Sequence, residues 1–298
     1  MTTVYVPGTE EQDTKKIIMS LHQIGPRLET AEDDIDALEA VTHREVLTAA
    51  RTYYVRTDGS NSNTGLANSS GGAFLTIQKA IDVVAALDIS TYAVTITVVA
   101  GTYTGTVVVT GPWVGSGTVT LNGDTTTPSN VVISVTSADA VVLNNAARLS
   151  IQGFKLTGAT SGFALLYSKS GSALTLSGKN EFGSAPAHQI VAEGGYVYAS
   201  NPEILSGTIA GGHYFALNNG FIYCQSATWT SSGTWTGGGF AQAITGGVIY
   251  AFSNTSSGTF VGQRYNASMN GAIQSNGGGA NYFPGDSAGA TATGGQYA

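Results

Sequence analysis

A short strand-like phrase recurs about every 25 residues from Ala147 to about residue 275. It reads Ala-Arg-Leu-Ser-Ile at 147–151, and further copies lie at 171–176, 194–199, 219–224, 246–251 and 270–274. A fixed period of roughly 20 to 50 residues is typical of a solenoid, a propeller or a repeat array. A unit of this length is too short for a four-stranded propeller blade. The repeat therefore predicts one coil of a parallel β-helix.

The alternation inside the phrase predicts which side chains line the interior, because successive side chains of a strand point to opposite faces. Stacking the copies gives two inward columns of apolar or small residues with an outward column between them. The first inward column contains Leu149, Leu174, Val197, Ile222, Ile249 and Ile273, and the second contains Ile151, Leu176, Ala199, Cys224, Ala251 and Ser275. The outward column contains Ser150, Thr175, Tyr198, Tyr223, Tyr250 and Gln274.

The composition fits an ordered, narrow solenoid. Charged residues make up 10% of the 298 residues, against about 25% in an average domain, but a hydrophobic content of 42% with regular alternation argues against disorder. The single cysteine, Cys224, falls in an inward column, so we expect a small core residue and no disulfide within one chain. A run of about 18 apolar residues is absent, as is a basic start before an apolar stretch, so the sequence predicts neither membrane insertion nor a signal peptide.

The first 50 residues differ from the rest of the chain. They carry ten acidic and four basic side chains, which gives −6 of the total charge of −7. The sequence lacks the clustered basic face that nucleic-acid binding would require. Heptad spacing predicts two short helices, 10–24 and about 27–47, separated by Gly25-Pro26. Neither is stable alone at this length, so we expect them to pack against copies of themselves. The expected trimer seam contains Ile17, Leu21, Ile24, Leu28, Ile35 and Leu38.

The remaining residues are expected to form one all-β solenoid in three parts. Residues 51–146 would contain the entrance, with an amphipathic capping helix over about 76–87 and the first, irregular coils. A helix across an open end covers exposed strand edges, which every solenoid must protect. Residues 147–275 would form the regular coils. Residues 276–298 depart from the repeat and would form either a terminal cap or a segment that wraps a neighbouring chain.

Three motifs stand at the start of this solenoid: Tyr-Val-Arg-Thr-Asp-Gly-Ser-Asn at 54–61, Phe-Leu-Thr-Ile-Gln-Lys-Ala at 74–80 and Ala-Gly-Thr-Tyr at 100–103. Together they resemble the entrance of pectin-lyase-like right-handed parallel β-helices, where such segments form the first strand, the capping helix and the first coils. The helical N-terminus, with Gly-Gln-Arg-Tyr-Asn at 262–266 and Tyr-Phe-Pro-Gly at 282–285, resembles tail fibre and tailspike proteins of phages and prophages. The resemblance implies a homotrimer whose N-terminal segment attaches to the virion and whose β-helix faces the host surface.

Three glutamates are the candidates for catalysis. Catalytic members of the wider superfamily carry clustered Asp with Arg or Lys on one face, and this chain departs from that pattern, with only Glu181, Glu193 and Glu203 as acids in its regular coils. Cleavage of a glycan by acid–base chemistry needs two carboxylates flanking one bond. Glu181 and Glu203 are 22 residues apart, slightly less than a coil, and Glu193 can lie around the corner from one of them. The alternative is three isolated solvated charges, and the sequence leans away from an enzyme.

Two histidines, His188 and His213, are one period apart. A stacked pair of histidines can bind a metal or titrate near neutral pH, and the alternative is a solvated pair without function. The sequence contains no His, Cys and Asp grouping with metal-ligand spacing and no Asp cluster suited to calcium. We therefore expect no metal and no cofactor.

The aromatic residues of the outward columns give the main surface feature. Tyrosine combines an apolar ring with a polar tip and suits both carbohydrate stacking and protein interfaces. The ladder would therefore face the three-fold axis of a trimer, bind a glycan, or reflect strand propensity alone. It contains Tyr196, Tyr198, Phe221, Tyr223 and Tyr250. Trp229 and Trp235 lie in a Ser, Thr and Gly-rich segment that reads as a protruding loop, which makes them further candidates for sugar stacking.

These features predict a structural protein of the phage virion. A trimeric tail fibre or short spike would attach through residues 1–50 to another phage structural protein and bind host-surface polysaccharide by multivalency. It would be made in the bacterial cytoplasm and assembled into the virion. One alternative is a depolymerising tailspike, a glycosidase or polysaccharide lyase in which at least two of the three glutamates converge. The others are a collar or tail decoration protein that binds no receptor, and a bacterial adhesin or secreted pectin-active enzyme.

Overall fold

The computed structural model describes residues 15–16, 18–21, 24, 44–161 and 163–298. The chain divides into two units, Met1–Glu45 and Val46–Ala298. In the first unit, the described residues before Arg44 have helical backbone, and Leu21 and Ile24 of the expected trimer seam are exposed. The other seam positions, Ile17, Leu28, Ile35 and Leu38, lie outside the described residues.

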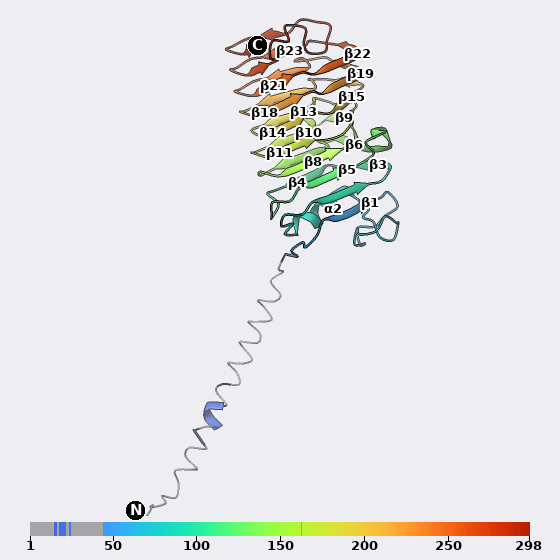
Figure 1. The fold of residues 1–298 in the computed structure, drawn as a ribbon, viewed down its shortest axis with the longest axis vertical. Helices are drawn as coiled ribbons and strands as arrows, with labels where there is room; N and C mark the ends of the chain where they lie inside the picture. Colours follow the sequence, from blue (N-terminus) through green and yellow to red (C-terminus); the bar gives the residue numbers. More distant parts are fainter. Residues whose placement is uncertain (1–14, 17, 22–23, 25–43, 162) are drawn as a thin grey trace, which may run out of the picture. The chain divides into compact units, whose positions relative to one another are not determined.

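The second unit is a right-handed parallel β-solenoid of about eight turns, with about 25 residues per turn (Figure 1). In the part of the chain that the structure describes, the strands form one ten-stranded and two eight-stranded sheets, and every pairing between these strands is parallel. Each regular coil adds a strand to sheet 1, then to sheet 2, then to sheet 3. The solenoid fold predicted from the repeat is therefore confirmed.

The three sheets run along the solenoid axis, and nearly every coil contributes one strand to each of them. Sheet 1 contains β1 (Arg51–Val55), β2 (Val94–Val98), β5 (Val119–Asn122), β8 (Arg148–Gln152), β11 (Ala173–Leu176), β14 (Tyr196–Ala199), β18 (Phe221–Gln225), β21 (Val248–Phe252), β24 (Ala272–Gln274) and β26 (Gln296–Tyr297). Sheet 2 contains β3 (Gly101–Thr104), β6 (Val131–Ser137), β9 (Lys155–Ser161), β12 (Asn180–Phe182), β15 (Pro202–Leu205), β19 (Thr228–Trp235), β16 (Thr208–Ile209) and β22 (Thr255–Val261). Sheet 3 contains β4 (Val107–Thr110), β7 (Val141–Asn144), β10 (Ala164–Lys169), β13 (His188–Glu193), β17 (Tyr214–Leu217), β20 (Ala241–Ala243), β23 (Tyr265–Ala267) and β25 (Ala290–Thr291). A short 3-10 helix, η1 (Pro128–Asn130), precedes β6.

The expected capping helix is α2 (Ile77–Ala85), at the entrance of the solenoid. It begins at Thr76, whose side chain accepts a hydrogen bond from the backbone N–H of Lys79 and so satisfies one unpaired amide of the first turn. The helix buries Ile77, Ala80, Ile81 and Val84 against the first coils. This apolar stripe covers the end of the core, as the spacing of these residues predicts.

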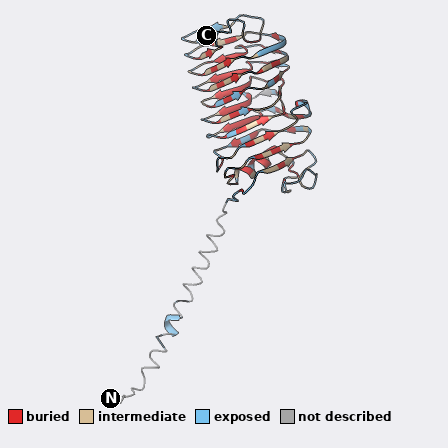
Figure 2. Cartoon of the chain, in the orientation of Figure 1, coloured by how far each residue is buried: buried red, intermediate tan, exposed pale blue. Residues whose placement is uncertain are grey.

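The interior of the solenoid contains the two predicted inward columns. Leu149, Leu174 and Val197 pair in register on neighbouring strands, and the column continues through Ile222 and Ile249 to Ile273. The residues of both columns are almost completely buried, including Cys224. Figure 2 shows this buried interior along the stacked coils. Burial of such columns contributes about 25 cal/mol for each Å² of apolar surface removed from water.

The turn between sheet 3 and sheet 1 explains part of the repeat. Asn218 and Asn219 both adopt left-handed backbone conformations, with φ of 50° and 62°, a region that asparagine tolerates better than most residues. A Cβ atom on the following Gly220 would lie 2.0 Å from the carbonyl oxygen of Ala192 in the neighbouring coil. Glycine is therefore required where the two coils approach. Equivalent left-handed pairs occur at Asn145 and Ala146 and at Met269 and Asn270.

Both ends of the second unit continue the solenoid. Leu47 is buried and its backbone N–H bonds to the carbonyl of Asp88, so residues 46–50 pack with the entrance. At the other end, β25 and β26 extend sheets 3 and 1, and Phe283 is buried against Trp229 and Phe240. Residues 276–298 thus pack on their own chain.

Candidate functional site

The predicted aromatic ladder lies on the outer face of sheet 1. Tyr198, Tyr223 and Tyr250 pair in register on β14, β18 and β21, with ring centroids 6.3 and 6.0 Å apart. Tyr196 and Phe221 form a second, parallel row at 6.4 Å. Tyr196 and Tyr198 are 45% and 42% exposed, so the N-terminal end of the ladder is open to solvent. The position of the ladder is confirmed, and its ligand stays a prediction.

A groove continues the ladder toward the entrance. Its volume is about 200 Å³, and its lining includes Arg148, Ser150, Ala173 and Thr175 of β8 and β11. These residues occupy the same two outward columns as the tyrosines, because Ala173 pairs with Tyr196 and Thr175 with Tyr198. Ser150, Ala173 and Thr175 are smaller than the rings that follow them in these columns, which leaves a depression beside the ladder. The arrangement gives one continuous track with a hollow at one end.

The two tryptophans do not protrude. Trp229 and Trp235 lie in β19 of sheet 2 and are 1% and 3% exposed. Both rings pack against Phe240, at 4.9 and 5.0 Å. The expected loop and the sugar-stacking position are therefore wrong. The two residues are six apart in one strand, an even spacing that places both on the inner face.

The three candidate carboxylates lie in three different environments. Glu181 is on the outer face of sheet 2, where its Oε1 forms an ion pair with Lys155 Nζ at 2.7 Å. Glu193 is on the outer face of sheet 3, where it accepts hydrogen bonds from the Tyr167 hydroxyl and from Asn218 Nδ2. Glu203 pairs in register with Asn180 and is 1% exposed inside the solenoid. The expected pairing of Glu181 with Glu203 is wrong, since one points outward and the other inward.

Glu203 belongs to a buried hydrogen-bonded network that the sequence did not indicate. Its Oε2 lies 2.7 Å from His213 Nε2 and accepts a hydrogen bond from the Tyr214 hydroxyl at 2.9 Å. His213 Nδ1 lies 2.7 Å from Gln189 Oε1, and Trp229 Nε1 donates to the Tyr214 oxygen at 3.2 Å. Within the described residues, Glu203 Oε1 has no hydrogen-bond partner. The one sequence feature that indicates the burial of Glu203 is the alternation in β15, which puts Glu203 on the same face as the buried Leu205.

The Gln189 amide fixes the direction of its hydrogen bond to His213. Gln189 Nε2 donates to the carbonyl oxygens of Phe182 and Gly183, so Gln189 Oε1 accepts a hydrogen bond from His213 Nδ1–H. Burial raises the pKa of the Tyr214 hydroxyl well above its usual value, and the nearby Glu203 raises it further. Burial likewise raises the pKa of the Cys224 thiol.

The two histidines are not stacked, because the local coil is 24 residues long: Ile190 pairs with Tyr214. His188 faces outward on sheet 3, stacked on Phe215 with ring centroids 4.3 Å apart. Its Nδ1 accepts a hydrogen bond from the backbone N–H of Gly212 at 3.2 Å. Burial under its aromatic neighbours lowers the pKa of His188 to about 4, so the imidazole is neutral at pH 7.

The outer face of sheet 3 is apolar over several coils. Val191 is fully buried there between Tyr167 and Phe215, although it points away from the solenoid interior. The ring of Phe163 covers one side of this cluster, 5.3 Å from both Tyr167 and His188, and Lys169 Nζ lies 3.9 Å above the Tyr167 ring. Burial raises the pKa of Tyr167, and its hydrogen bond to Glu193 raises it further.

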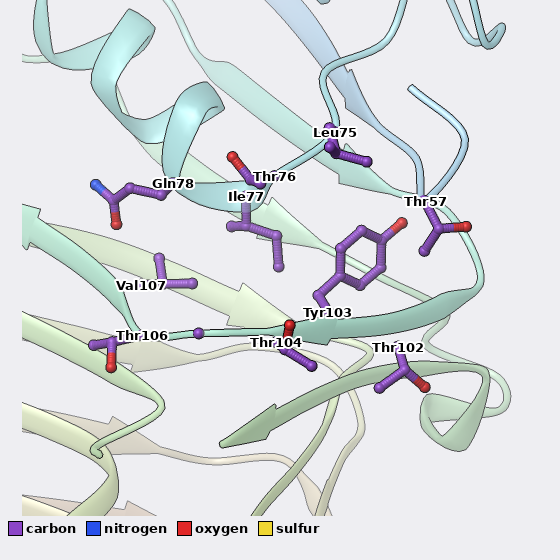
Figure 3. A pocket seen from close by; sticks show the side chains of 11 residues that line it. Thr57, Leu75, Thr76, Ile77, Gln78, Thr102, Tyr103, Thr104, Thr106 and Val107 are labelled. Carbon is purple, nitrogen blue, oxygen red and sulfur yellow. The ribbon is translucent and has the colours of Figure 1, made fainter. Parts of the chain in front are cut away.

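A second concave site, the entrance pocket, lies between the start of α2 and the connection from β3 to β4 (Figure 3). Its volume is about 380 Å³. Ile77 of α2 and Tyr103 of β3 point into it, and threonines surround it. Burial raises the pKa of Tyr103 to about 12, so this phenol stays protonated at neutral pH.

The described residues form neither a metal centre nor a membrane-spanning helix. Among them, no three His, Cys, Asp or Glu side chains gather as a metal site would require. In the same part of the chain, no helix is long and apolar enough to cross a membrane.

Comparison with protein-family models, with curated proteins and with solved structures gives no match for this chain.

Proposed function

We propose that the chain is a structural binding protein, of the kind that forms the fibre or spike of a phage tail, and that it holds a host-surface glycan on the ladder of sheet 1. The observation that carries this proposal is the in-register row of tyrosines, half-exposed at one end and continuous with a groove. Neighbouring strands lie about 4.8 Å apart, so the row presents successive rings to an extended ligand.

The tyrosines suit a polysaccharide better than a small molecule. Their rings offer apolar faces to the C–H surfaces of sugar rings, and their hydroxyls remain available to sugar hydroxyls. Several weak contacts along a rigid track add up in one ligand. If residues 1–50 join three copies, three such tracks raise the avidity without any new contact.

The geometry of the acids favours binding over cleavage. A glycosidase needs two carboxylates on either side of one bond, about 5 to 10 Å apart. Glu203 is enclosed in the core, Glu181 is neutralised by Lys155, and Glu193 lies on another sheet. A depolymerase that uses these three residues has no common site for its substrate.

Alanine variants of the ladder test the proposal. Tyr198→Ala and Tyr223→Ala should each weaken binding to surface polysaccharides by about tenfold in affinity electrophoresis. Tyr54→Ala is the matched control, because Tyr54 also faces outward on sheet 1 but lies on β1, away from the ladder. Equal polysaccharide binding by all three variants and the wild type would refute the ladder as the binding face.

The same variants separate a glycan face from a subunit interface. Light scattering should give the same oligomeric state for Tyr198→Ala and the wild type. Loss of the oligomer with unchanged glycan binding would assign the ladder to subunit packing. Absence of polysaccharide binding in the wild type would leave a collar or tail decoration protein as the better description.

A further inference from the structure

The entrance pocket has the chemistry of a site for a single sugar. We propose that it binds one neutral hexopyranose unit, independently of the ladder, which lies on β14, β18 and β21. Its volume of about 380 Å³ falls within the range of about 300–1000 Å³ found for small-molecule sites. The pocket is separate from the surface used in the proposed function.

The floor of the pocket is apolar and rigid. The residues Ile77, Tyr103 and Val107 are only 3%, 7% and 3% exposed. Figure 3 shows the Ile77 and Tyr103 side chains directed into the space between the helix and the strand. The Tyr103 hydroxyl lies 2.8 Å from the carbonyl oxygen of Val99 and 3.2 Å from that of Val55, and hydrogen bonding of its proton to this backbone fixes the ring. Such a floor matches the apolar C–H face of a pyranose.

The rim offers unused hydroxyl groups. Thr57, Thr102 and Thr104 are exposed, and within the described residues their hydroxyls have no hydrogen-bond partner. Each hydroxyl both donates and accepts, which suits the hydroxyls of a sugar. By contrast, Thr106 already donates to the carbonyl oxygen of Asp139 at 2.7 Å, and Thr76 caps α2.

The pocket is formed before any ligand arrives. The Gln78 side chain is held by three hydrogen bonds, to the backbone N–H and carbonyl of Val108 and to the Asp82 carboxylate. These bonds tie the first turn of α2 to β4. A site that needs no reordering loses less free energy on binding.

The lining selects against charged ligands. Among the described residues, those that line the pocket are all uncharged. Arg56 forms an ion pair with Asp58 at 2.8 Å and is not part of the lining. A phosphate, carboxylate or ammonium group would lose hydration in this pocket without gaining a counter-charge, which is unfavourable.

The test is a titration of the full-length protein by calorimetry and saturation-transfer NMR. The probes are the methyl glycosides of glucose, galactose and mannose, with methyl glucuronide as the charged counterpart. At least one neutral glycoside should bind, and the glucuronide should bind at least about tenfold more weakly than that glycoside. Thr102→Val and Thr104→Val keep the shape and remove one hydroxyl, so each should weaken binding by about five- to tenfold.

Two controls keep the result specific. Thr104→Ser retains the hydroxyl and should retain binding, as should Thr110→Val, which removes an exposed hydroxyl of β4 outside the pocket. Failure of all neutral glycosides to bind, unchanged binding by both pocket variants, or equal binding of the glucuronide would each overturn the inference. Tyr198→Ala should keep monosaccharide binding, so failure of the ladder and failure of the pocket are distinguishable.

Discussion

Replacing His213 by leucine is expected to destabilise the solenoid by about 3–5 kcal/mol, because the change leaves Glu203 buried without its main partner. Both side chains are at most 1% exposed, and the contact between Nε2 and Oε2 is 2.7 Å. After the change, the Tyr214 hydroxyl is the only remaining donor to the carboxyl group within the described residues. A lone hydroxyl does not compensate for the hydration that a carboxylate loses on burial.

The double variant Glu203→Leu/His213→Leu should be more stable than the sum of the two single changes, Glu203→Leu and His213→Leu, predicts. It contains no buried charge, but the Tyr214 hydroxyl and the Gln189 carbonyl oxygen each lose one hydrogen bond, at about 1 kcal/mol apiece. The interaction free energy between the two changes should therefore be about 2 kcal/mol or more. Lys155→Met is the control, since loss of a partly exposed ion pair should cost less than about 1 kcal/mol.

Urea unfolding at pH 7 measures these differences. Trp229 is a suitable fluorophore, because its indole donates to the Tyr214 hydroxyl, which in turn donates to Glu203 of the pair. Each coil contacts only its neighbours, so hydrogen exchange should also show early loss of protection in β13, β15 and β17. The claim that Glu203 and His213 form a coupled buried pair would be refuted by either of two results. One is a decrease in unfolding free energy below about 1 kcal/mol for His213→Leu, and the other is simple additivity in the double variant.

Three further predictions concern groups elsewhere in the solenoid. The pKa of His188 is lowered from 6.5 to about 4, so the stability contributed by its neutral imidazole should be fully present above about pH 6.5 and should fall by up to about 3 kcal/mol as the pH drops to 4. In denaturation curves His188→Gln should lack this part of the loss, and an identical slope would contradict the assignment. Trp229→Ala should cost about 3–5 kcal/mol in urea unfolding, whereas an unchanged midpoint would mean that Trp229 is not buried. The Cys224 thiol, whose pKa is raised by burial, should react with iodoacetamide only after unfolding, and rapid labelling of the native protein would show that it is accessible.

The sequence was sufficient to predict the solenoid and its regular columns. Alternation and period together placed Leu149, Leu174 and Val197 in one ladder, and the structure confirms that register. The same reasoning placed Tyr198 and Tyr223 side by side on the outside. These predictions succeeded because each copy of the phrase carries its own marker of register, the glycine or asparagine turn before the strand.

The candidate site could not be predicted equally well, because the coil length varies. In sheet 2, Asn180 pairs with Glu203, a spacing of 23, and in sheet 3 Ile190 pairs with Tyr214, a spacing of 24. A slip of one residue moves a side chain to the opposite face. An average period therefore cannot decide whether Glu203 or His213 points into the core, and both point inward.

The measurement that tests glycan binding by the ladder most directly is size-exclusion chromatography of purified protein incubated with bacterial capsular polysaccharides and lipopolysaccharide O-antigens. We expect one polymer to co-elute with the protein at unchanged chain length, and Tyr198→Ala and Tyr223→Ala to abolish the co-elution. Shortened polymer chains would contradict a binding protein and establish a depolymerase. Polymers that neither bind nor shorten would exclude these glycans as ligands of the ladder.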